Sequence, residues 1–110
     1  MNEMLDAVDR IVLEAIDEAL SILGDKGRES IYYFIEREYL IEKEDIPSNL
    51  KKFSDCLHLI FGIGSNVIER HIINTLKKKA NVEVKLDDDL DFVESMEIVK
   101  GIIRKKVSMT

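Results

Sequence analysis

The sequence predicts an all-α fold, a compact bundle of about five helices. In several stretches apolar residues recur at three- and four-residue spacing, which is typical of helices with one buried face. One proline and five glycines in 110 residues leave few points where a helix must end. This length suits a single domain over residues 1–110, large enough to bury its own core, which we expect over residues 3–79.

The first two helices are predicted on either side of Gly24. Apolar residues repeat on one face over residues 5–23, and Gly24 follows in the position of a left-handed C-terminal cap. The second helix is expected to begin at Asp25, whose side chain suits an N-cap, and to end near Tyr39.

A connector over residues 40–46 is expected to lead into the third helix. Ile46 precedes Pro47, and a residue before proline is biased away from helix. The third helix is then predicted over about residues 48–61. Its broad apolar face comprises Leu50, Phe53, Cys56, Leu57, Ile60 and Phe61.

Gly62 and Gly64 predict a tight corner between the third helix and a fourth over about residues 66–79, because glycine adopts positive backbone angles readily. Asn66 and Glu69 have the spacing of a capping box at the start of that fourth helix. Its inward residues are expected to be Val67, Ile68, Ile72, Thr75 and Leu76.

The last part of the chain predicts an extended linker and a final helix. Residues 82–86 alternate polar and apolar, but a lone strand has no partner, so a linker is favoured over a strand. Acidic residues 87–89 and basic residues near 100–106 match the two ends of a helix dipole over about residues 89–106.

Charge and cysteine content narrow the class of protein. The net charge is −6, with thirteen acidic and five basic residues in 1–47 and nine acidic and eleven basic residues in 48–110. An acidic whole disfavours non-specific nucleic-acid binding. The single Cys56 cannot form an internal disulfide, and no apolar run is long enough to span a membrane, so a cytoplasmic protein is expected.

No motif of a known catalytic class is present, so the sequence predicts no enzyme, cofactor or metal. Cys56, His58, Glu69 and His71 are candidate metal ligands that lie within sixteen residues of one another. Cys56 and His58 are two residues apart, as are Glu69 and His71, so on a helix the two side chains of each pair point about 200° apart. Neither pair therefore has the i,i+4 spacing that lets one helix bind a metal with two ligands. Glu69 lies at the edge of an apolar face, where a role at the helix N-terminus is favoured over catalysis.

A nucleic-acid-binding regulator is the alternative function. The order helix, glycine corner, helix resembles a helix-turn-helix, and the outward face of the fourth helix has side chains suited to phosphates and bases. These candidate contacts are Arg70, Asn74, Lys77 and Lys78. A solvated basic face is favoured over a DNA-reading one, since lysines also complement a helix C-terminus.

Self-association as a homodimer is the favoured partnership. The last helix has a heptad-like seam, a candidate dimer interface formed by Phe92, Met96, Val99 and Ile103. Extra apolar residues outside the main faces, namely Leu13, Tyr33, Leu59 and Ile98, indicate a second contact surface.

The central stretch resembles a small archaeal family of helical output domains of the Nitrosopumilus type, over about residues 12–79. The resembling positions are Tyr32, Glu36–Tyr39, Ile46, Pro47, Phe53, Leu57, Ile60–Gly64 and Ile68, Glu69 to Leu76. The resemblance implies a non-enzymatic signalling or interaction role and supplies no catalytic residue. The sequence therefore predicts an interaction or signal-output module.

Overall fold

The computed structural model describes residues 6–109 and confirms the all-α prediction. Within this range lie five α-helices: α1 (Ala7–Leu20), α2 (Gly24–Tyr39), α3 (Leu50–Phe61), α4 (Ser65–Lys79) and α5 (Phe92–Ser108). Three short 3-10 segments connect them: η1 (Ser21–Leu23), η2 (Lys43–Ser48) and η3 (Gly62–Gly64). Residues 82–86 form no strand and belong to the α4–α5 connection, as predicted.

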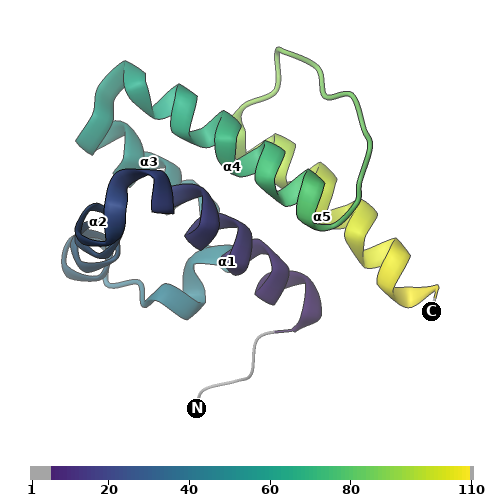
Figure 1. The fold of residues 1–110 in the computed structure, drawn as a ribbon, viewed down its shortest axis with the longest axis horizontal. Helices are drawn as coiled ribbons and strands as arrows, with labels where there is room; N and C mark the ends of the chain where they lie inside the picture. Colours follow the sequence, from purple (N-terminus) through teal and green to yellow (C-terminus); the bar gives the residue numbers. More distant parts are fainter. Residues whose placement is uncertain (1–5, 110) are drawn as a thin grey trace.

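Helices α1 and α4 lie side by side through the middle of the molecule, and their mutual contact is the most extensive between any two helices (Figure 1). The remaining helices pack around this pair, within overall dimensions of 38 × 37 × 22 Å. The fully buried side chains include Val12, Ile16, Leu20, Ile35, Ile46, Phe53, Leu57, Ile72, Leu76, Met96 and Val99.

Helix α5 contributes to this core, so the predicted core over residues 3–79 was too short. The Phe92 ring lies 6.3 Å from the Phe53 ring, centroid to centroid. Residues 3–5, which the sequence assigns to the core, lie outside the described range.

The heptad-like seam of α5 is therefore an internal seam. Phe92, Met96, Val99 and Ile103 are buried within one chain. Apolar residues spaced alternately four and three positions apart can pack against any neighbouring helix, whether of the same chain or of a partner. Here α5 packs against α1, α3 and α4 of its own chain. These four residues offer no surface to a second molecule in this structure, and the candidate interface on them was wrong.

Several helix starts differ from the predicted ones. Helix α2 begins at Gly24, whose φ of 83° is positive, and Asp25 lies inside the first turn instead of capping it. At α5 the side chain of Asp91 accepts from the Glu94 N–H at 2.8 Å while Glu94 accepts from the Asp91 N–H, a complete capping box that the sequence reading missed.

The connector before α3 is more helical than predicted. Ile46 and Pro47 lie inside η2, and both are buried. A short 3-10 segment accommodates proline at a position where the interior of an α-helix does not. Ahead of it, the residue that caps the C-terminus of α2 is Leu40, a non-glycine residue with a left-handed φ of 58°.

Candidate functional site

A polar groove lies between helices α3 and α4 and the segment leading from Lys85 into the first turn of α5. Its volume is about 950 Å³. The α4–α5 connection, whose last part forms one wall of this groove, arches away from the helices in Figure 1. The groove is within the size range of sites for small molecules.

A buried carboxylate, that of Glu69 on α4, lines this groove. Its side chain is 9% exposed, and Oε2 accepts a hydrogen bond from Ser54 Oγ at 2.5 Å. Its other oxygen, Oε1, is 3.3 Å from His58 Nε2. The predicted capping box with Asn66 was wrong, because no side chain caps α4 and the Glu69 carboxylate is bound by α3 instead.

The side chains of Ser54, His58 and Glu69 do not form the hydrogen-bonded chain of a catalytic triad. In such a triad the serine hydroxyl is held by the histidine, and the acid orients the other ring nitrogen. Here Ser54 and His58 both contact Glu69, and Ser54 is itself 9% exposed. The arrangement stabilises a buried carboxylate and holds α3 against α4.

The four candidate metal ligands are not brought together. Cys56 points into the core and is fully buried, which raises the pKa of its thiol to about 11. His58 and Glu69 meet, but His71 is not part of their contact. Among residues 6–109 there is no group of three or more His, Cys, Asp or Glu side chains able to hold a metal ion.

The candidate nucleic-acid contacts on α4 are split by the groove. Arg70, Asn74 and Lys77 line it, whereas Lys78 lies outside it. The same groove is lined by Asp87, Asp88 and Asp91. These carboxylates would repel a phosphate backbone approaching the basic residues, so the arrangement does not favour the nucleic-acid alternative.

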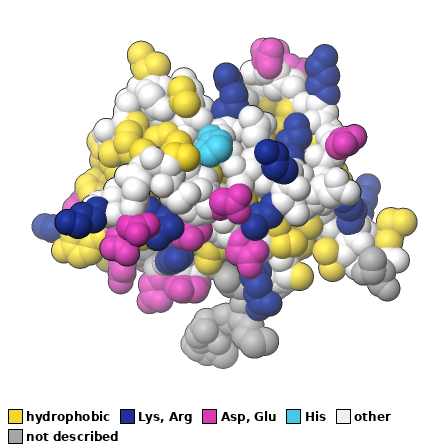
Figure 2. Space-filling view, in the orientation of Figure 1, with side chains coloured by type: hydrophobic (Ala, Val, Ile, Leu, Met, Phe, Trp, Pro, Cys, Tyr) yellow, Lys and Arg dark blue, Asp and Glu magenta, His cyan; other side chains and the backbone are white. Residues whose placement is uncertain are grey.

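An apolar corner, defined here as Leu59, Ile60, Ile63 and Val67, projects into solvent where α3 turns into α4. Their exposed fractions are 67%, 39%, 88% and 69%. Figure 2 shows apolar side chains gathered at the upper left of this face, over the start of α4. Leu59 was expected outside the main apolar face, but Ile60 and Val67 were expected inward, and both of those expectations were wrong.

The corner is exposed for a local reason. Gly62 has a φ of 58° and ends α3, and the Ser65 hydroxyl donates to the Gly62 carbonyl at 2.7 Å. This tight turn redirects the chain within three residues, so the side chains on its outer side have no neighbouring helix to cover them. Helical periodicity alone places Ile60 and Val67 inward because it ignores the turn.

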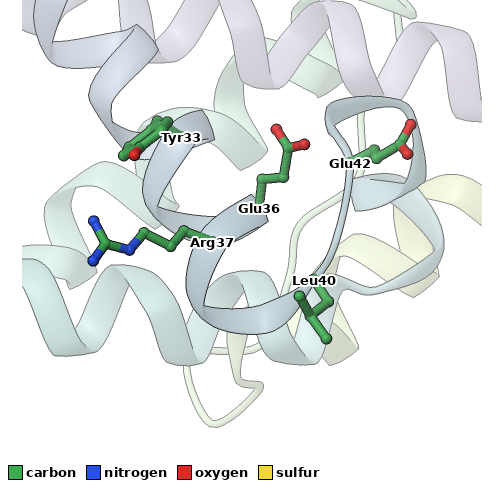
Figure 3. A pocket seen from close by; sticks show the side chains of 5 residues that line it. All are labelled: Tyr33, Glu36, Arg37, Leu40 and Glu42. Carbon is green, nitrogen blue, oxygen red and sulfur yellow. The ribbon is translucent and has the colours of Figure 1, made fainter.

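A second, smaller hollow of about 500 Å³ lies at the end of α2. Figure 3 shows its lining side chains, Tyr33, Glu36, Arg37, Leu40 and Glu42, pointing in different directions rather than toward one centre. Tyr33 and Leu40 are 64% and 86% exposed. Because its polar groups do not converge, this hollow is a weaker candidate than the groove.

Comparison with known proteins adds no relative: no protein-family model, curated protein or solved structure matches the chain. The resemblance to the output-domain family therefore stays a prediction. No helix within residues 6–109 is long and apolar enough to cross a bilayer.

Proposed function

We propose that this chain is a non-enzymatic, cytoplasmic interaction or signal-output module that forms a homodimer through the apolar corner. The observation that carries the proposal is the exposure of Leu59, Ile63 and Val67, each more than half accessible and adjacent along the turn. Contiguous exposed apolar patches on soluble proteins commonly mark interaction sites.

A second copy of the chain is the partner that this surface fits most simply. A two-fold interface places the same patch on both sides, so an apolar patch is complementary to itself without any matching charge. Full burial of a Leu, Ile or Val side chain contributes roughly 1.5–3 kcal/mol. A few such side chains must offset an association cost of several kcal/mol, so we expect a weak, reversible dimer.

Sedimentation velocity over a concentration series tests this function. We expect the native chain to shift from monomer to dimer as concentration rises and Ile63→Glu to remain monomeric. Leu40→Glu is the matched control, because Leu40 is 86% exposed but lies at the end of α2, away from the corner. A native chain that stays monomeric at high concentration, or an equal loss of dimer in both variants, would contradict the proposal.

A further inference from the structure

The polar groove brings charges of both signs together, and only some of them are paired with each other. Four basic side chains and five acidic ones line it. Lys51 and Asp55 form an ion pair at 2.8 Å. Within residues 6–109, the side chains of Arg70, Lys77 and Lys85 make no hydrogen bond or ion pair.

The unpaired cations of α4 and the carboxylates near the start of α5 belong to different walls of the groove. Arg70 and Lys77 lie on α4, while Asp87, Asp88 and Asp91 lie on the segment from the end of the α4–α5 connection into α5, which also carries Lys85. Asp91 is held in place because it caps α5, and the Asp87 carboxylate accepts from the Asp89 N–H at 3.1 Å. The carboxylates of Asp87 and Asp91 are therefore held by backbone contacts of their own segment rather than by ion pairs with α4.

The groove lining also includes a buried carboxylate and apolar side chains. Glu69 is held by Ser54 and His58 and is 7% exposed as a whole residue. Ile73 and Leu86, both half-buried, also line the groove. A ligand with a short hydrocarbon chain would cover these two side chains.

We propose that the groove binds a small zwitterionic molecule, with its cationic group toward Asp88 and Asp91 and its anionic group toward Arg70 and Lys77. A ligand with one charge would leave the wall of like charge facing it, which costs binding free energy. A ligand that bears both charges on a short chain satisfies the two walls at once. This proposal does not depend on the apolar corner, which lies outside the groove.

Three probes of one chain length test the charge requirement: 6-aminohexanoate, hexylamine and hexanoate. Each is titrated into ¹⁵N-labelled full-length protein at low ionic strength while amide shifts are followed by NMR. We expect saturable shifts with 6-aminohexanoate at Arg70, Lys77 and residues 87–91. Hexylamine and hexanoate should each bind about tenfold or more weakly, the loss of one charge-assisted contact.

Neighbouring residues supply matched control variants. Lys77→Gln and Asp88→Asn should each weaken 6-aminohexanoate binding about tenfold, for the same reason. Lys78→Gln and Asp89→Asn remove the same charges one residue away, outside the groove lining, and should leave binding unchanged. All four side chains are accessible enough that folding is expected to persist, which the amide spectrum reports directly.

Four results would overturn the proposal: no saturable binding of 6-aminohexanoate, equal binding of all three probes, equal effects of the groove and control variants, or displacement of 6-aminohexanoate by double-stranded DNA. The last would assign the groove to nucleic acid. Failure of this proposal is separable from failure of the dimer, since Ile63→Glu should bind 6-aminohexanoate as the native chain does.

Discussion

The ammonium group of Lys100 donates a hydrogen bond to the backbone carbonyl of Pro47 at 3.1 Å, across 53 positions of sequence. Lys100 is 5% exposed and also lies 3.5 Å from the Asp9 carboxylate. One buried cation thus joins α5 to η2 and to α1.

Replacing Lys100 by methionine should lower the free energy of unfolding by about 3 kcal/mol, since removal of one partner leaves the Pro47 carbonyl and the Asp9 carboxylate unpaired. Urea denaturation measures this change. Lys105→Met, at an exposed position of the same helix, should change stability by less than about 0.5 kcal/mol. Similar urea midpoints for the two variants would contradict the bridging role of Lys100.

Met96→Ala separates the core role of the α5 seam from a dimer role. Met96 is fully buried, so its truncation should cost about 3 kcal/mol of stability, from lost burial and the cavity left behind. The concentration dependence of sedimentation should be unchanged wherever the variant is folded. Ile98→Ala, at a 40% exposed position, is the control with a small expected cost. Loss of dimer in folded Met96→Ala would restore the seam as an interface.

The contact between Ser54 and Glu69 should show energetic coupling. Glu69→Ala and Ser54→Ala each remove one side of a buried hydrogen bond and should each cost about 1–3 kcal/mol. The double variant should cost less than the sum, by about 1 kcal/mol, because no partner is then left unpaired. Additive costs in urea denaturation would mean that the hydrogen bond contributes nothing. Arg70→Ala, one residue along α4 and exposed, controls for changes in the helix itself.

Cys56 should make stability fall in alkaline solution. Burial raises the pKa of its thiol from 9.0 to about 11, so the unfolded chain loses this proton at lower pH than the folded chain. The contribution is fully present below pH 9.0 and is lost as pH rises toward about 11. In that window the native chain should lose stability more steeply with pH than Cys56→Ala. Equal slopes for the two chains would show that Cys56 is not the cause.

Leu40→Gly should stabilise the protein by about 1 kcal/mol, because a left-handed backbone angle costs a residue with a Cβ atom about that much. Leu40 has this angle and is 86% exposed, so little packing is lost. Leu40→Ala keeps the Cβ and should gain nothing. Thermal unfolding compares the two variants, and an equal effect of both would exclude the backbone explanation.

Local features were predictable from the sequence where neighbours in the chain determine them. The helices, the corner at Gly62 and the absence of a strand over residues 82–86 follow from periodicity and backbone preference, which act over a few residues. The Asp91–Glu94 capping box is equally local: its sequence pattern was available, although the helix was predicted to start two or three residues too early.

The candidate site depended on contacts that no local pattern contains. Glu69 was expected at the helix start, but α3 places Ser54 and His58 against its carboxylate. Acidic residues 87–89 were predicted to complement the helix dipole, and only the path of the α4–α5 connection brings Asp87 and Asp88 into the same groove as Arg70 and Lys77.

The sequence by itself determined which segments are helical and which face of each helix is apolar. The tertiary structure alone decided what each face meets: Lys100 is buried, Val67 is exposed, and the Met96 seam packs inside one chain. The physical reason is range. Helix propensity and periodicity act within about one or two turns, whereas burial and charge pairing depend on which distant helices come into contact.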